Sequence, residues 1–471
     1  MRSPILPVIL GLTLLTGCAV GPNYHRPPVT TPTQYRQPTP PPEPLDKASL
    51  ADLQWSTLFQ DDVITNLVKS SLTQSHDLEA ATQRVIQARA QLGISRSQLA
   101  PNITASGSYN ATRSSSVGSF VFLQPGTNLA ASYTQAGFNL SWELDVWGRI
   151  RRLNQSARAQ YLASEEARHA VMASLIADVI TSYLTLRELD LELEISRKTE
   201  QAGQDGLKLT QLRKSQGAAS GLDVRQAEEL LYTATAQVAA TQRAIAETED
   251  QINLLLGQNP ADVTRGKPLI DLVGPSKVPA GLPSALLERR PDIRQAEQTL
   301  ISANAQIGAA EAQYFPQITL TGFLGVQSRG LSNLLTAPAR DQSLAPGGLL
   351  PIFNAGQIRN NVRLTKAQQQ EAVANYRKAI NTGFKEVSDA LTDVEKNREQ
   401  REQEELLVNA LKDATNLSTL RYKGGLDSYL QVLDSERNEF SGELTLAQLR
   451  KNELLSLVQL YRALGGGWQN P

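Results

Sequence analysis

Hydrophobic residues in the first third of the chain follow two different periods in turn. One stripe recurs every seven residues, the spacing of one face of a helix: Leu78, Val85, Leu92 and Leu99. The stripe stops at Pro101, a residue that ends helices. Apolar and polar residues then alternate along 103–110 and again along 138–144, as in half-polar strands. The pattern predicts a helix followed by a β-hairpin at about 101–145.

The second half of the chain repeats the first. Residues 76–107 align without a gap on residues 291–322, and later positions align as well. The matched residues include turn formers, which shared helical composition does not explain. They include the pairs Gly93/Gly308, Pro101/Pro316, Gly148/Gly356, Arg213/Arg421, Gly217/Gly425 and Ser220/Ser428. We therefore interpret the chain as an internal duplication.

The duplication predicts the domain organisation. The predicted parts are a signal peptide at 1–17, a lipid-anchored extended segment at 18–60, a first repeat at 61–257, a linker in an equatorial region at 258–284 and a second repeat at 285–471. Each repeat contains a helix, a hairpin, a long helix and a further helix, the second hairpin lying at about 316–353. The long helices run from about Ile150 to Arg213 and from about Ile358 to Arg421, each of order 95 Å.

Four strands per chain determine the expected assembly. Four strands cannot close a membrane barrel, and an open sheet edge is not tolerated in hydrocarbon. Two chains supply eight strands, whose barrel interior fills with side chains, whereas three chains supply twelve and leave a lumen. The fold class expected is an α+β membrane protein with a trimeric 12-stranded β-barrel, four strands per chain, continuous with a long α-helical coiled-coil tunnel.

Composition excludes several classes of function. The chain of 471 residues carries 46 basic and 47 acidic residues, so no overall charge attracts nucleic acid. The histidines His25, His76 and His169 are scattered, and no phosphate-binding loop or H-E-x-x-H run occurs. We expect no enzyme, no metal site and no cofactor beyond a covalent lipid.

The single cysteine, Cys18, follows a segment with one basic residue and an apolar stretch. This is the pattern of a signal peptide, and Leu15-Thr16-Gly17-Cys18 looks like a bacterial lipobox. The mature chain then begins at an acylated Cys18, and Ala19 after it implies passage to the outer membrane. The alternative is an ordinary secretory signal with an incidental cysteine.

Several runs resemble the TolC superfamily, and within it the lipoprotein outer membrane factors of RND-type pumps, the NodT and OprM branch. These runs lie at residues 17–24, 141–152, 281–310, 349–360 and 421–437. The resemblance implies a homotrimer in outer-membrane lipid that extends into the periplasm. It also implies a closed periplasmic tip that opens when a periplasmic adaptor, the membrane fusion protein, and an inner-membrane RND transporter dock. The function implied is an exit duct for small toxic compounds.

The tip is expected at the turns that follow the long helices. Ser220 with Asp223, and Ser428 with Gln431, form S-x-x-D/Q patterns typical of helix capping boxes. Asp223 also matches a family position near the tip constriction, so capping and gating both remain open for it.

Two residues of the second turn differ in type from the residues at the matching positions of the first turn. Asp427 pairs in the repeat with Ala219, and Tyr422 with Lys214, so the fold does not demand them. We predict a periplasmic gate at Asp427, Tyr422 and Asp434, where three Asp427 carboxylates form a ring that attracts cations. The alternatives are a solvated loop carboxylate at Asp427 and simple pairing of Asp434 with Arg437 or Arg421.

Two rival functions remain. A lipoprotein coiled-coil adaptor has long helices but does not need hairpins between them. An exit duct for type I protein secretion shares the entire fold.

The aromatic residues Phe138, Trp142 and Trp147 fit a membrane girdle, although packing at the strand-to-helix junction accounts equally well for Trp147.

Overall fold

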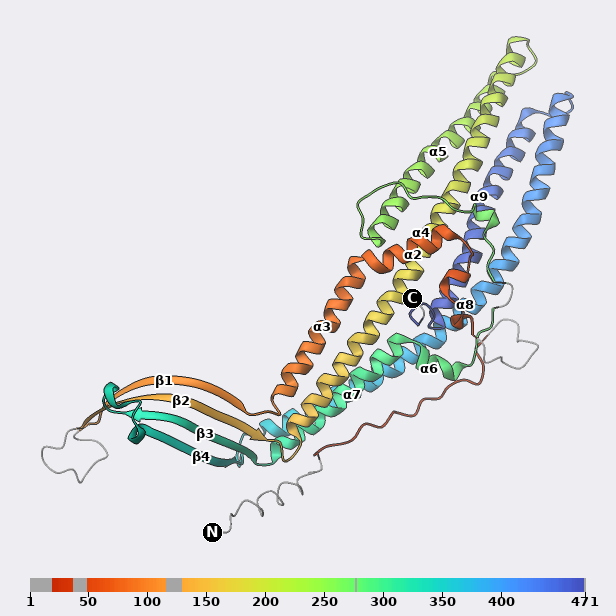
Figure 1. The fold of residues 1–471 in the computed structure, drawn as a ribbon. Helices are drawn as coiled ribbons and strands as arrows, with labels where there is room; N and C mark the ends of the chain where they lie inside the picture. Colours follow the sequence, from red (N-terminus) through yellow and green to blue (C-terminus); the bar gives the residue numbers. More distant parts are fainter. Residues whose placement is uncertain (1–18, 37–48, 116–128, 276–277, 470–471) are drawn as a thin grey trace. The chain divides into compact units, whose positions relative to one another are not determined.

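The computed structural model describes residues 19–36, 49–115, 129–275 and 278–469 (Figure 1). The signal peptide and Cys18 lie outside these residues. The chain forms two compact units, one of which comprises residues up to Pro27 with Val85–Ala163 and Ala296–Asn375. The other comprises Pro28–Arg84, Ser164–Gln295 and Tyr376–Pro471.

The first unit contains one antiparallel sheet in the order β1-β2-β3-β4 (Figure 1). The strands are β1 (Asn102–Arg113), β2 (Ala130–Leu144), β3 (Gln317–Ser328) and β4 (Arg340–Leu349). β2 of the first repeat pairs with β3 of the second, with Phe138 opposite Leu324. The sheet is therefore open, with β1 and β4 as its two edges.

The two faces of the sheet differ in polarity. One face presents large apolar side chains that are more than half exposed in the single chain: Ile103, Phe138, Leu324 and Leu344. The other face is polar, as where Asn139 donates a hydrogen bond to Ser106 across β1 and β2 at 2.7 Å. This alternation is the one expected of a strand with one face toward lipid and one toward water.

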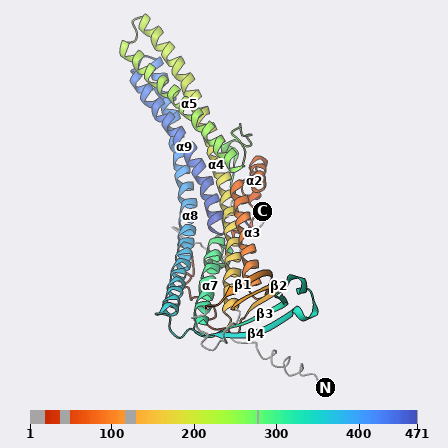
Figure 2. The same cartoon turned by 90° about the vertical axis from the view of Figure 1, so that its left-hand side faces the viewer.

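Helices form the rest of the fold. Their bounds are α2 (Asp62–Gln74), α3 (His76–Ser97), α4 (Arg149–Ser215), α5 (Gly221–Leu255), α6 (Leu286–Arg289), α7 (Pro291–Glu311), α8 (Gln357–Lys423) and α9 (Tyr429–Ala463). The two long helices, α4 and α8, have 67 residues each, and each passes through a short turn into the next helix. Figures 1 and 2 both show the α4–α5 hairpin beside the α8–α9 hairpin.

The second unit has a large apolar core. α4 and α9 supply most of it, together with residues that precede α2. The side chains include Leu50, Leu58, Ile176, Ile180, Tyr183, Leu457 and Leu460. By length and composition α4 is apolar enough to cross a membrane, but 56% of its most apolar window is buried, which is typical of a core helix.

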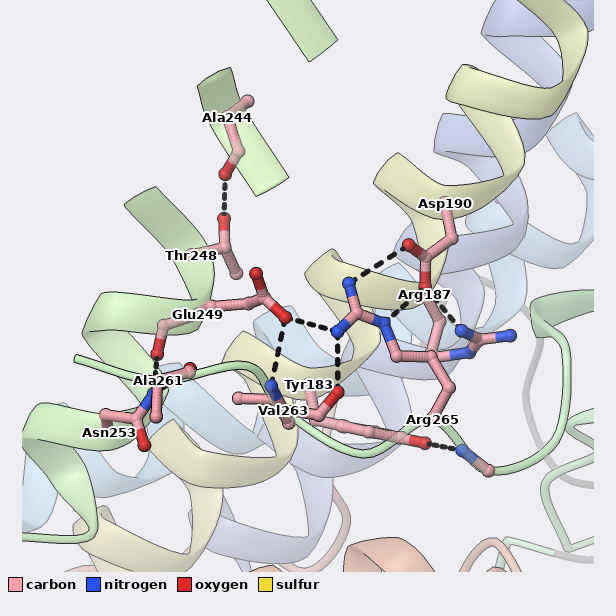
Figure 3. A network of polar contacts seen from close by, with 11 residues as sticks. Tyr183, Arg187, Asp190, Ala244, Thr248, Glu249, Asn253, Ala261, Val263 and Arg265 are labelled. Carbon is pink, nitrogen blue, oxygen red and sulfur yellow. Dashed lines mark hydrogen bonds and ion pairs between the residues drawn. The ribbon is translucent and has the colours of Figure 1, made fainter. Parts of the chain in front are cut away.

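The segment between the repeats is fixed to both helices of the first hairpin (Figure 3). Arg265 forms ion pairs with Asp190 of α4 and with Glu249 of α5. The backbone N–H of Gly266 donates to the Tyr183 hydroxyl at 2.7 Å, and that of Val263 donates to Glu249 at 3.0 Å. These bonds satisfy backbone groups that would otherwise be unpaired next to the helices.

Candidate functional site

The turn after α4 is built by glycine and by a helix cap. Gly217 has a φ of +73°, a left-handed conformation that closes the helix, and the Ala218 N–H donates to the Arg213 carbonyl at 2.8 Å. α5 then starts at a reciprocal capping box. The Asp223 N–H donates to the Ser220 hydroxyl at 3.2 Å, and the Ser220 N–H donates to the Asp223 carboxylate at 2.6 Å. Asp223 is thus engaged in the cap.

The turn after α8 has the same backbone but a different closing contact. Gly425 has a φ of +74°, and the Leu426 N–H donates to the Arg421 carbonyl at 2.9 Å. The Arg421 guanidinium binds both carboxylate oxygens of Asp427, at 2.5 and 3.1 Å. These hydrogen bonds lower the pKa of Asp427 from its ordinary value. The carboxylate predicted to line the gate is therefore paired within its own turn.

The capping box predicted at Ser428 is absent. Ser428 occupies the position before α9, but its side chain makes no capping hydrogen bond. Instead, the Gln431 N–H donates to the Ser428 backbone carbonyl at 3.2 Å. Because the carbonyl already accepts this hydrogen bond, the hydroxyl is not needed as an acceptor.

Tyr422 lies buried between the two hairpins, with 7% of its surface exposed. The Arg213 guanidinium of α4 lies 4.4 Å from the centre of its ring and donates to its carbonyl at 3.3 Å. The Tyr429 ring of α9 lies 5.3 Å away in a tilted arrangement. A small apolar cluster encloses the pair, made of Ala227, Leu230, Val432 and Leu433 with Leu207 beside it. Tyr422 thus joins the first hairpin to the second.

The Tyr422 hydroxyl contributes nothing visible to this contact. It is buried, and it has no hydrogen-bond partner among the residues that the structure describes. The ring and the backbone carbonyl, which any aromatic residue supplies, therefore make the contact with Arg213.

Asp434 is not paired with either predicted arginine. Asn438 donates a hydrogen bond to it at 3.4 Å on the exposed face of α9. Arg421 binds Asp427, and Arg437 reaches across to Glu229 of α5 at 2.5 Å. Asp434 therefore keeps an exposed carboxylate.

One carboxyl group near the turn is strongly perturbed. Burial, together with a smaller effect of the neighbouring Glu439 carboxylate, raises the pKa of Glu436 to about 7. Glu436 lies on α9, seven residues after Tyr429, and burial also raises the pKa of that tyrosine. This part of α9 can therefore change its charge near neutral pH.

Sequence reasoning did not assign a role to Arg213 or Glu436. The matched pair Arg213/Arg421 was a usable signal, because both halves retain an arginine at the end of the long helix. No sequence pattern indicated that the two would bind different partners. No sequence motif marks Glu436, because the shift of its pKa depends on burial, which the neighbouring residues in the sequence do not report.

Phe138, Trp142 and Trp147 differ in their exposure and contacts. Phe138 is 57% exposed on the apolar face of the sheet. Trp142 donates its ring N–H to the Leu99 carbonyl at 3.0 Å. Trp147 donates to the Pro316 carbonyl at 2.8 Å and stacks on Phe315 at 4.8 Å, which is packing at the strand-to-helix junction.

Within the described ranges, no group of three or more His, Cys, Asp or Glu side chains could hold a metal ion.

Known proteins resemble this chain along almost its whole length. It is 38% identical over 474 residues to the solvent efflux pump outer membrane protein SrpC of Pseudomonas putida, covering 99% of each chain. It is 32% identical over 472 residues to the cation efflux system protein CusC of Escherichia coli, again covering 99% of each. The open-state MtrE outer membrane channel of Neisseria gonorrhoeae superposes with a TM-score of 0.85 at 30% identity, covering 96% of this chain and 99% of that one.

These likenesses confirm the predicted fold class. The chain is an outer-membrane channel protein in which each copy supplies four strands and several long helices. The family model for outer membrane efflux proteins matches residues 67–258 and 282–466 of the sequence, which together make up most of the chain. The chain belongs to the outer membrane efflux protein family.

Proposed function

We propose that three copies of this chain form the outer-membrane exit duct of a tripartite RND-type efflux pump that expels small toxic compounds. The observation that carries the proposal is the match over 99% of the chain to pump outer membrane proteins such as SrpC. The open sheet supports a shared barrel, because its edges β1 and β4 need partners in lipid. A periplasmic adaptor and an inner-membrane RND transporter are the partners of such a duct.

The duct is closed at the two helical turns. Tyr422 is the central gate residue of this proposal, because it contacts elements of both hairpins. Asp427 contributes a carboxylate whose negative charge is balanced by the Arg421 guanidinium. Asp434 supplies the exposed negative charge, and Asp223 serves the helix cap. Opening requires the contact between Arg213 and Tyr422 to break.

The mature chain is anchored in the outer membrane by lipid on Cys18. The lipobox residues 15–18 support this modification, and Ala19 supports sorting to the outer membrane. The segment from Ala19 to Pro27 belongs to the same compact unit as the sheet. An anchor there keeps the chain at the membrane while its strands assemble.

Gene deletion with complementation tests the proposal. We expect the deletion strain to become at least fourfold more susceptible to several chemically unrelated solvents and antibiotics, and the wild-type gene to restore resistance. Loss of a secreted protein from the medium, with unchanged susceptibility, would instead favour the type I secretion duct. Susceptibility to cations alone would narrow the cargo to the class in the name of CusC, a cation efflux system protein.

A further inference from the structure

One aromatic ring lies on the polar face of the sheet. Residues that are opposite each other in neighbouring strands point to the same face, and Phe323 of β3 is opposite Asn139 of β2. Asn139 bonds to Ser106 on the polar face, so Phe323 shares that face. In a membrane barrel the polar face lines the lumen and the apolar face meets lipid. Phe323 therefore belongs to the wall of the pore.

The ring differs in character from the wall around it. The neighbouring residues on this face carry hydroxyl or amide groups, as do Thr104, Ser106, Asn139, Thr319, Thr321 and Gln327. Of the described strand residues on this face, only Phe323 and Leu349 have large side chains without a polar group, and Leu349 ends β4. Phe323 is thus the one large apolar group within the described part of this polar surface.

Two glycines hold the ring in place. Gly137 and Gly325 are opposite each other in β2 and β3, on the same face as Phe323. A Cβ built on Gly137 would lie 2.8 Å from the Phe323 Cζ, and one built on Gly325 would lie 2.6 Å from it. The tip of the ring thus fills the space that two side chains would occupy, and the ring is partly buried against the wall.

The other repeat shows that the fold does not require this arrangement. β1 and β3 both have 12 residues, and in the duplication Phe323 aligns with Ser108 and Gly325 with Asn110. There the Asn110 side chain donates to the Ser108 hydroxyl at 3.1 Å, which makes a polar surface in place of the ring. One explanation is structural, because a ring that covers strand glycines offsets the stability that they cost. That role uses only the side of the ring that lies on the glycines.

We propose that the Phe323 rings, one from each copy of the chain, form a binding site for aromatic and apolar cargo in the lumen. The inference rests on the proposed function, because an exit duct brings such compounds past the rings. The glycine pair covers one side of each ring, and the side turned away from the sheet faces the pore. An aromatic molecule can stack on this side, and an organic cation is attracted to the electrons of the ring.

The site is expected to be weak. A duct needs binding that retains a molecule briefly and then releases it, since a tight site would stop conduction. One aromatic contact supplies binding of that order, because a stacked pair adds little beyond the area that it buries. The hydroxyl and amide groups around the ring offer an apolar molecule no equivalent contact. We therefore expect a severalfold change in occupancy when the ring is removed.

Block of single-channel current tests the site. The purified trimer is placed in a planar bilayer, and tetraphenylphosphonium, an aromatic cation, is added on the side of the barrel rather than of the tip. Phe323→Leu removes the ring but keeps an apolar side chain, and it should shorten the blocked state about threefold. Phe138→Leu is the matched control, because Phe138 is 57% exposed on the apolar face, and it should leave the blocked state unchanged. An unchanged blocked state in Phe323→Leu, or equal shortening in Phe138→Leu, would overturn the site.

A second cation makes the test independent of how well a variant assembles. In the wild-type channel, tetraphenylphosphonium should block severalfold longer than tetrabutylammonium, which is of similar size but has no rings. Equal block by the two cations would also overturn the site. If the gene deletion raises susceptibility but the ring has no effect on block, this site alone is refuted. If the ring prolongs block but the deletion changes no susceptibility, the exit duct is refuted and the site remains.

Discussion

In the proposed gate, replacing Arg213 should weaken the closed state of the tip, because the Arg213 guanidinium contacts Tyr422 from the other hairpin. Arg213→Met keeps the aliphatic bulk but removes a guanidinium 4.4 Å from the Tyr422 ring centre, a contact of about 0.5–2 kcal/mol. It also removes a charge-assisted hydrogen bond at 3.3 Å, about 1.5 kcal/mol for such a bond at the weak end of its range. The two contributions add to about 2–3.5 kcal/mol per subunit.

That energy is large on the scale of a conformational equilibrium. Since about 1.4 kcal/mol changes an equilibrium constant tenfold, the open fraction should rise about 30-fold or more. The assay is single-channel recording of the purified trimer in a planar bilayer, where Arg213→Met should open more often without adaptor or transporter.

Two controls make the result decisive. Tyr422→Phe removes a hydroxyl that bonds to nothing in the described part of the chain, so its open fraction should match wild type. Arg437→Met breaks the ion pair with Glu229, in which both side chains are about half exposed, so it should shift opening only a few-fold. Wild-type behaviour of Arg213→Met, or opening by Tyr422→Phe, would refute the reasoning.

Three further predictions use the same turns. Ser220→Ala should lower stability by about 1 kcal/mol in thermal unfolding while Ser428→Ala has almost no effect, because only the first serine caps its helix. Arg421→Ala should raise cation preference in reversal-potential measurements by baring Asp427, whereas equal preference would contradict a carboxylate in the pore. Because its folded pKa of about 7 exceeds the ordinary 4.5, Glu436 should make α9 less stable as pH rises from about 4.5 to 7. Hydrogen exchange of α9 should show that loss, and Glu436→Gln should abolish it.

The sequence predicted the elements because each depends on local periodicity. The seven-residue stripe that ends at Pro101 and the alternation after it correspond to α3 and β1, Asn102–Arg113. The long helices were predicted from the lack of helix-breaking residues, and α4 and α8 extend one or two residues beyond the predicted ends. Periodicity and helix breakers are properties of neighbouring residues, so one sequence suffices to read them.

Side-chain partners at the turns could not be predicted in the same way. Asp434 was assigned a possible arginine partner from proximity in sequence, but Arg437 faces α5 and binds Glu229 instead. Which face of α9 meets α5 depends on packing between hairpins that are about 200 residues apart in sequence. The same packing buries Glu436 and raises its pKa, and no local pattern reports it.

The duplication is informative about the proposed gate because identical residues in the two halves make different contacts. Ser220 and Ser428 are identical, yet only the first bonds to its helix through its side chain. Arg213 and Arg421 are also identical, but Arg421 closes its own turn on Asp427 whereas Arg213 crosses to the ring of Tyr422. The second half supplies both the carboxylate and the ring, so two equivalent arginines acquire different partners. A duplicated scaffold thus gains a contact between its halves through changes in one half alone, and under the proposed function that contact must break for the tip to open.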